Sequence, residues 1–332
     1  MRCVAFAFLC LFGGMLPAQA EPSCPGNPNA IGTSRTITVN PADLPRIGSM
    51  QYKHTLPLAD HEVAITFDDG PLPPYTDRIL DILAANCVKV TYFLVGQMAR
   101  AYPEQVRRIY EAGHTIGTHS QHHPFNFGEM GLPRIESEVN GGIASVETAL
   151  GDPRAVAPFF RVPGLARSRQ VESYLASQSL AVWSADEVAD DWHRGITAEQ
   201  IVRRAIRRIE ARDHRGVLLL HDIHPATVMA LPTLLKELKE LGYHIVQAVA
   251  PGERPKLPPE HAVPAVAQSG GWPRVFKTRA AAGEHPIKKR ARHGKHIAHS
   301  DTDPVVSAAI AKKKHKPQSA EATSPGLFWF LR

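Results

Sequence analysis

Residues 62–70 read EVAITFDDG: a continuous apolar run that ends in two aspartates and a glycine. A run of this length and composition, bounded by a glycine, is typical of a buried β-strand. Asp68 and Asp69 follow the strand directly, and their adjacent negative charges repel one another. A bound cation would relieve that repulsion; an ordinary turn in which Gly70 supplies backbone freedom is the alternative.

Short β-branched or aromatic runs recur beyond this stretch and alternate with helical patterns. Together with the first run they give seven expected strands, at residues 63–67, 90–95, 114–118, 159–161, 180–184, 217–220 and 244–248. Strict alternation of strand and helix favours parallel strands joined by right-handed crossovers. We therefore expect an α/β fold, a distorted barrel of about seven parallel strands, although an open parallel sheet has the same local pattern.

Three of the intervening helices have recognisable ends. Pro103 opens a helix over Gln105–Glu111, and Thr197 with Gln200 forms a capping box ahead of Ile201–Ile209. A third helix is expected over Leu231–Leu241, where Gly242 ends it.

Polar residues follow several of the expected strands at their carboxyl ends, where parallel α/β barrels carry their sites. They are Asp68, Asp69, His119, His123, Arg161, Gly164, Asp191 and His221.

A metal site is the most economical explanation for part of this set. His119 and His123 are four residues apart, so one helical turn would place both imidazoles on one face. With Asp69 they would supply two nitrogens and one oxygen, leaving positions open for water and substrate. Ordinary polar loop residues are the alternative reading of each histidine alone.

Two motifs carry a resemblance to a known family. They are Thr66-Phe67-Asp68-Asp69-Gly70 and His119-Ser120-Gln121-His122-His123. The chain resembles the polysaccharide deacetylases of the NodB-homology type, carbohydrate esterase family 4, over roughly residues 62–248. The resemblance implies a metal-dependent hydrolase, usually zinc-bound, that removes N-acetyl groups from glycans.

The resemblance also implies residue roles. Asp68 matches the general base, and Asp69, His119 and His123 match the metal ligands. Arg161 matches the arginine that holds the base, with a simple rim salt bridge as the alternative. These matches together account for the activation of water, because a divalent ion can lower the pKa of a water molecule from about 15.7 toward about 7.

Two further matches concern the breakdown of the amide. The backbone N–H of Gly164 matches a donor to the oxyanion, a position where many members of the family carry an aromatic residue. His221 matches the general acid that protonates the departing amine, which is a very poor leaving group without a proton.

The residue that supports His221 is less clear from the sequence. Asp191 and Trp192 match the last two positions of the family's Asp-x-x-Asp-Trp pattern, but Asp186 lies five residues before Asp191 rather than three. Asp190 is adjacent as well. We assign the role to Asp191, with Asp186 and Asp190 as alternatives. Trp192 and Leu219 match apolar walls around the acetyl methyl group, or else simply pack in the core.

The amino terminus has the pattern of a secretory signal peptide. An apolar run over residues 3–16 leads to Pro17-Ala18-Gln19-Ala20, which predicts cleavage after Ala20 and a secreted or periplasmic protein. An uncleaved anchor is the alternative, and no later run is long enough to span a membrane. An arm over residues 21–61 follows. After cleavage of the signal peptide, Cys24 and Cys87 are the cysteines that remain. They either form a disulfide, or Cys87 is simply a buried apolar residue.

The positive charge of the chain belongs to its carboxyl-terminal part. Residues 251–332 carry 15 basic and 6 acidic residues, or +9, whereas residues 21–250 net −4 and the whole chain +6. Without periodic apolar spacing, this Pro-, Lys- and His-rich tail is expected to be disordered. It either tethers the protein to an anionic envelope polymer or has no specific role, and we expect no nucleic-acid partner.

Together these observations predict a catalytic domain over residues 62–250. We expect an N-deacetylase acting on chitin oligomers or peptidoglycan with a divalent ion, most simply zinc. An O-acetyl esterase on acetylated xylan and a non-catalytic glycan-binding protein are the alternatives. The rim loops at residues 124–132 and 166–169 are expected to govern the choice of glycan.

Overall fold

The computed structural model describes residues 24–259. The expected signal peptide at residues 1–20 lies outside the described residues, as does the expected tail apart from residues 251–259. Within residues 24–259, no helix has both the length and the apolar character needed to cross a membrane.

The described residues form ten strands, and every strand pairing is parallel. All seven expected strands are present. The strands are β1 (Thr33–Thr38), β2 (Arg46–Ile47), β3 (Glu62–Asp68), β4 (Thr91–Leu94), β5 (Thr115–Thr118), β6 (Phe159–Arg161), β7 (Ala181–Trp183), β8 (Glu187–Val188), β9 (Gly216–His221) and β10 (His244–Val249).

The strand order is that of a distorted barrel. Hydrogen bonds connect β8, β9, β3, β4, β5, β6 and β7 in that order, and β7 continues along the chain into β8 after only three residues. β10 pairs with the start of β3, and β1 pairs with β10. The expected distorted barrel of parallel strands is confirmed.

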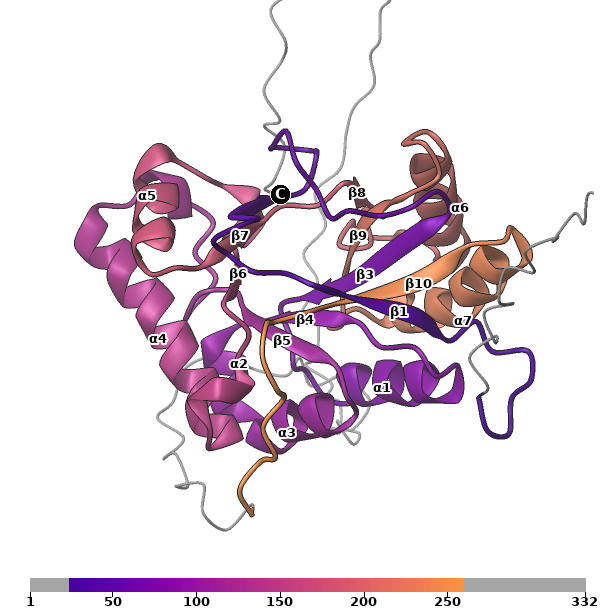
Figure 1. Cartoon of the computed structure of the whole chain (residues 1–332), viewed down its shortest axis with the longest axis horizontal. Coiled ribbons are helices and arrows are strands. Elements are labelled where there is room, and N and C mark those ends of the chain that lie inside the picture. The colour runs from indigo at the N-terminus through magenta and orange to yellow at the C-terminus, as the bar shows by residue number, and fades with distance from the viewer. Residues whose placement is uncertain (1–23, 260–332) are drawn as a thin grey trace, which may run out of the picture. The chain divides into compact units, whose positions relative to one another are not determined.

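Seven α-helices of the described residues pack outside the strands. They are α1 (Tyr75–Ala85), α2 (Gly96–Ala101), α3 (Pro103–Glu111), α4 (Leu132–Leu150), α5 (Arg169–Ser177), α6 (Ala198–Glu210) and α7 (Pro225–Glu240). Neighbouring contacts run from α6 through α7, α1, α3 and α4 to α5. Figure 1 shows α4 and α5 on one side of the strands and α6 and α7 on the other.

The expected helix ends are present with one correction. Pro103 begins α3, and the capping box of Thr197 and Gln200 at the start of α6 has both of its hydrogen bonds. The prediction that a helix begins at Leu231 is wrong, because α7 begins at Pro225 and contains Pro232. Burial of Val228 and its neighbours on the core face outweighs the cost of an internal proline, which is about 3 kcal/mol.

The alternation of side chains along β3 fixes where the aspartates lie. Val63, Ile65 and Phe67 point toward the helices, whereas Ala64 packs in a second cluster inside the barrel with Phe93 and Trp183. Because side chains alternate along a strand, Thr66 and Asp68 share the interior face with Ala64. Asp68 therefore lies inside the barrel at the carboxyl end of the strand.

The segment before Glu62 is part of the same sheet. In this segment β1 pairs with β10 and extends the sheet, and β2 pairs with β7. A Cys24–Cys87 disulfide joins the segment to the residues after α1. The sequence pattern predicts no strand here, because β1 is an edge strand whose residues are mostly exposed and it lacks a buried apolar run. The structure thus forms the disulfide that the sequence left open.

Candidate active site

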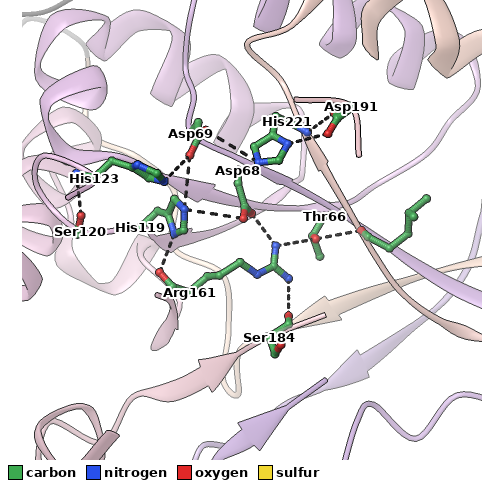
Figure 2. Close-up of polar contacts among 11 residues, drawn as sticks. Thr66, Asp68, Asp69, His119, Ser120, His123, Arg161, Ser184, Asp191 and His221 are labelled. Atoms are coloured by element: carbon green, nitrogen blue, oxygen red, sulfur yellow. Dashed lines mark hydrogen bonds and ion pairs between the residues drawn. The ribbon is translucent and has the colours of Figure 1, made fainter. Parts of the chain in front are cut away.

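The polar side chains expected at the strand ends meet at one edge of the barrel. Asp68 ends β3 and Asp69 follows it, whereas His119 and His123 follow β5. Arg161 ends β6 and His221 ends β9. Figure 2 shows Asp69 between the imidazoles of His119 and His123 on one side and His221 on the other, with Arg161 reaching Asp68.

Asp69, His119 and His123 each offer one ligand atom, and these atoms lie within 4.8 Å of one another. The Asp69 Oδ1 atom is 3.4 Å from His119 Nε2 and 3.3 Å from His123 Nε2. Asp69 follows the end of β3 with a positive φ of 80°, outside the extended conformation of the strand. Both carboxylates therefore reach the same imidazole nitrogen, since Asp68 Oδ2 lies 3.9 Å and Asp69 Oδ1 3.4 Å from His119 Nε2.

The hydrogen bonding of His119 indicates what this cluster holds. Its Nδ1 atom lies 2.6 Å from the Arg161 carbonyl oxygen, which can only accept, so Nδ1 carries the proton and Nε2 presents a lone pair. That lone pair faces Asp69 Oδ1, a buried acceptor without a hydrogen-bond partner. Two acceptors facing each other fit a cation between them, so the residues present fit a divalent metal ion.

Burial also keeps His119 in the form that binds a metal. It lowers the pKa of His119 to about 4, despite the opposing charges of Asp68 and Asp69. A neutral imidazole at pH 7 has a free nitrogen lone pair, which is what coordination requires.

The reason given for the His119–His123 spacing is wrong. The two residues lie in a loop rather than on a helical turn, and Ser120 and His123 both have positive φ, at 66° and 54°. The His123 N–H donates to Ser120 Oγ at 3.0 Å, which closes the loop. Gly142 of α4 lets that helix approach closely, since a Cβ there would lie 2.6 Å from the Ser120 carbonyl carbon.

Asp68 is held by a completely buried arginine. Arg161 Nη1 donates to Asp68 Oδ1 at 2.6 Å and to Thr66 Oγ1 at 2.8 Å, and Nη2 donates to the Ser184 carbonyl oxygen at 2.9 Å. The guanidinium also lies 4.2 Å from the centre of the Phe93 ring. Arg161 is thus fixed from several sides and orients one carboxylate oxygen of Asp68.

His221 forms a second buried pair. Its Nδ1 lies 2.7 Å from Asp191 Oδ1, and its backbone N–H donates to Asp191 Oδ2, also at 2.7 Å. Thr227 donates to the same oxygen at 2.6 Å. Burial alone lowers the pKa of His221, but the Asp191 charge and hydrogen bond, helped by Asp69 and Asp68, raise it to about 10. The contacts with Asp191 thus favour the protonated form of His221.

The two alternatives to Asp191 lie elsewhere. Asp190 forms ion pairs with Arg204 and Arg208 of α6, at 3.0 and 2.8 Å. Asp186 accepts hydrogen bonds from the Ser49 N–H, the Thr55 hydroxyl and the Val217 N–H. Neither carboxylate reaches His221, so Asp191 is its partner.

The remaining expected residues lie at the same edge. Gly164 has a positive φ of 56° and opens onto free space, since a Cβ there would meet no atom within 4 Å. The Trp192 ring lies edge-on to His221 with ring centres 5.4 Å apart. Leu219 shares a face of β9 with His221 and is buried. Nothing in these contacts assigns a role in the reaction.

Sequence reasoning missed the residues that position the site. Arg161 is held by the Thr66 hydroxyl and by the Ser184 backbone carbonyl, which no sequence motif reveals. Asp191 is held by the Thr227 hydroxyl. Asp222 is also buried and accepts from Thr76 Oγ1 at 2.6 Å, while Gly70 leaves room for its carboxylate. Burial raises the pKa of Asp222 to about 7.

Comparison with known proteins identifies related sequences. A sequence model of the polysaccharide deacetylase family matches residues 56–183. Over 215 residues the chain is 31% identical to a chitooligosaccharide deacetylase of Sinorhizobium fredii, covering 59% of this chain and 95% of that protein. It is 32% identical over 188 residues to the peptidoglycan-N-acetylglucosamine deacetylase PgdA of Listeria monocytogenes, covering 55% of this chain. The match spans only 37% of that relative's length.

A solved structure shares the fold. The peptidoglycan deacetylase Bd3279 of Bdellovibrio bacteriovorus superimposes with a TM-score of 0.58 at 30% sequence identity, covering 66% of this chain and 59% of that one. The segment that the family model matches contains the two aspartates at the end of β3 and the two histidines after β5. On the sequence match and the fold together, the chain belongs to the polysaccharide deacetylase family.

Proposed function

We propose that this protein is a metal-dependent hydrolase that removes N-acetyl groups from N-acetylglucosamine-containing glycans and releases acetate. The observation that carries the proposal is the convergence of Asp69, His119 and His123 beside one carboxylate, Asp68, and opposite the imidazole of His221. A base and an acid on two sides of a metal site are what amide hydrolysis requires. The relatives named above support glycan deacetylation as the reaction class.

Asp68 is assigned the role of general base. Its Oδ1 is held by Arg161, and its Oδ2 lies 3.9 Å from His119 Nε2, beside the proposed ligands. The carboxylate accepts the proton of the attacking water while Arg161 keeps it in place. A divalent ion held by Asp69, His119 and His123 would acidify that water and polarise the acetyl carbonyl.

His221 is assigned the role of general acid. Its Nδ1 is bound by Asp191, so Nε2 is the atom that donates a proton to the departing nitrogen. The Gly164 N–H is assigned as a donor to the oxygen that gains negative charge in the tetrahedral intermediate. Trp192 and Leu219 are assigned as apolar walls for the acetyl methyl group.

Zinc is the metal that we propose. Two imidazole nitrogens and one carboxylate oxygen form a ligand set that zinc commonly adopts in hydrolytic sites, with further positions left for water and substrate. The proton on His119 Nδ1 and its carbonyl partner support this assignment, because metal-binding histidines are generally oriented in this way.

An acetate-release assay tests the function. Purified protein would be given chitin oligomers, peptidoglycan and acetylated xylan, with and without a chelator. We expect acetate from one of the two N-acetylated glycans, and loss of that activity with the chelator. Release from acetylated xylan alone would support the O-acetyl esterase instead, and binding without release would support a non-catalytic glycan-binding protein.

His221 separates the amidase from the esterase. An alkoxide leaves more readily than an amide nitrogen, so an esterase depends less on a proton donor. His221→Ala should therefore cost an N-deacetylase about 10²- to 10⁴-fold in rate, and an esterase much less.

We also propose that the protein acts outside the cytoplasm. Support comes from the signal-peptide pattern at residues 1–20 and from relatives named for peptidoglycan deacetylation. The same proposal divides the chain into an arm at 21–61, a catalytic domain at 62–250 and a basic tail at 251–332. The tail tethers the protein to an anionic polymer. Amino-terminal sequencing of the exported protein should begin at Glu21.

A further inference from the structure

A hollow of about 200 Å³ lies between the two rim loops that follow β5 and β6. Its lining is Phe125, Asn126, Gly128 and Glu129 from the first loop and Ala166 and Arg167 from the second. Sites that enclose a drug-sized ligand usually measure about 300–1,000 Å³, so this hollow suits one part of a longer ligand.

The two loops are built to lie against each other. A Cβ at Gly128 would lie 2.5 Å from the Ala166 carbonyl oxygen, so only glycine permits this approach. The second loop is anchored from below, because Gln51 donates to the Leu165 carbonyl oxygen at 2.8 Å. These contacts hold the backbones of the two loops against each other.

Arg167 is the positioned cation of the hollow. Its Nη1 donates to the largely buried Glu172 at 2.8 Å, and its guanidinium lies 5.2 Å from the centre of the Tyr52 ring. The side chain is still 42% exposed, so donors of the guanidinium face outward. Asn126 and Arg167 can thus meet hydroxyl or amide oxygens of a ligand.

Phe125 connects the hollow to the metal site. Its side chain is 78% exposed, and its ring lies edge-on to the proposed metal ligand His123 with ring centres 5.2 Å apart. Single exposed apolar residues are common and carry no argument by themselves. Here the exposed ring is also a wall of the hollow, next to the place where the acetyl group would react.

We propose that this hollow is a sugar subsite: the pyranose ring next to the deacetylated N-acetylglucosamine lies with its C–H face on Phe125, and its polar substituents face Asn126 and Arg167. An aromatic face and a few fixed polar groups are the combination that a flat ring with an apolar face and polar edges requires. The inference rests on the proposed function and names the part of the glycan that is bound at this rim. Phe125 is then a specificity-determining residue for oligomers over isolated acetyl groups.

The test compares Phe125→Ala and Phe125→Trp with the wild-type chain. Substrates are chitopentaose, which fills the subsite, and 4-nitrophenyl acetate, which has no sugar. We expect Phe125→Ala to lower kcat/KM for chitopentaose about tenfold, mainly through KM, without changing ester hydrolysis. Phe125→Trp should keep the wild-type value. Leu241→Ala is the matched control, because Leu241 is exposed at the opposite end of the barrel, just before β10.

Two results would overturn the subsite: equal activity of Phe125→Ala and wild type on both substrates, or an equal loss on both, which would mean that Phe125 acts only through His123. Calorimetric titration of chitopentaose keeps this test separate from catalysis. If wild type releases no acetate, the proposed function fails, yet Kd should still rise about tenfold in Phe125→Ala. An unchanged Kd then refutes the subsite as well.

Discussion

Asp186 and Asp69 are both enclosed carboxylates of the barrel, but their surroundings differ. Asp186 lies between β7 and β8, and its two oxygens accept three hydrogen bonds from Ser49, Thr55 and Val217. Asp69 lies at the rim, where its Oδ1 is buried without a hydrogen-bond partner and faces two imidazole nitrogens. A satisfied carboxylate holds chain segments together, whereas a buried acceptor that faces two imidazole nitrogens fits a cation held between them.

The largest effect is expected at the rim. Asp68→Asn removes the proton acceptor and should lower the rate of acetate release about 10²- to 10⁴-fold, with the fold intact by circular dichroism. Asp190→Asn is the matched control, because Asp190 pairs with α6 and its positive φ suits asparagine. An Asp68→Asn variant as active as wild type would remove the base from the mechanism.

Asp186 should contribute to stability rather than to chemistry. Asp186→Ala leaves three donors without their acceptor, so we expect the free energy of unfolding to fall by about 3 kcal/mol. Urea denaturation of Asp186→Ala and Asp69→Ala, each with and without added zinc, measures the contrast. Zinc should stabilise Asp186→Ala as it does wild type but leave Asp69→Ala unchanged. Equal stabilisation of both would abolish the distinction between the two carboxylates.

A smaller effect is expected from the partner of His221. Asp191→Asn removes the charge that raises the pKa of His221, so the protonated acid is lost at a lower pH than in wild type. The alkaline limb of the kcat/KM profile should therefore move to lower pH, and the rate at pH 8 should fall about tenfold. A profile that keeps its alkaline limb would show that Asp191 does not tune the acid.

The last effect concerns stability and a histidine away from the rim. Burial lowers the pKa of His114 to about 3, and the charges of Lys89 and Arg254 act in the same direction. In the unfolded chain this histidine titrates near about 6.5, so its contribution to stability is present above that pH and declines as pH falls toward 3. Between pH 7.5 and 5 wild type should lose about 2 kcal/mol more than His114→Asn. Parallel urea curves for the two proteins would contradict this.

The strands that were predictable from the sequence are those with a buried apolar run. β3 and the paired aspartates were found in this way, because both faces of that strand are covered and every residue of it is buried. β1, β2 and β8 were not, since β1 is largely exposed and the other two have only two residues each. The Cys24–Cys87 pairing was also undecided, because cysteines 63 residues apart need not be close in space.

The candidate site was predictable as a set of residues but not as a geometry. Motif spacing identified His119 and His123, yet the structure brings them together through positive-φ residues in a loop rather than through a helix. The choice among Asp186, Asp190 and Asp191 depended on the register of β8 against β9, which pairs Glu187 with Leu218 and Val188 with Leu219. The Ser184 carbonyl that fixes Arg161 is a backbone group, so its role could not be predicted from the residue type.

Metal content tests the central claim most directly. Wild-type protein and the Asp69→Ala, His119→Ala and His123→Ala variants would be equilibrated with zinc, dialysed and measured by elemental analysis, with Asp186→Asn as a control. The account predicts one tightly held ion per chain in wild type and control and none in the three variants. Zinc retained at the wild-type level by any of the three, or absent from wild type, would contradict it.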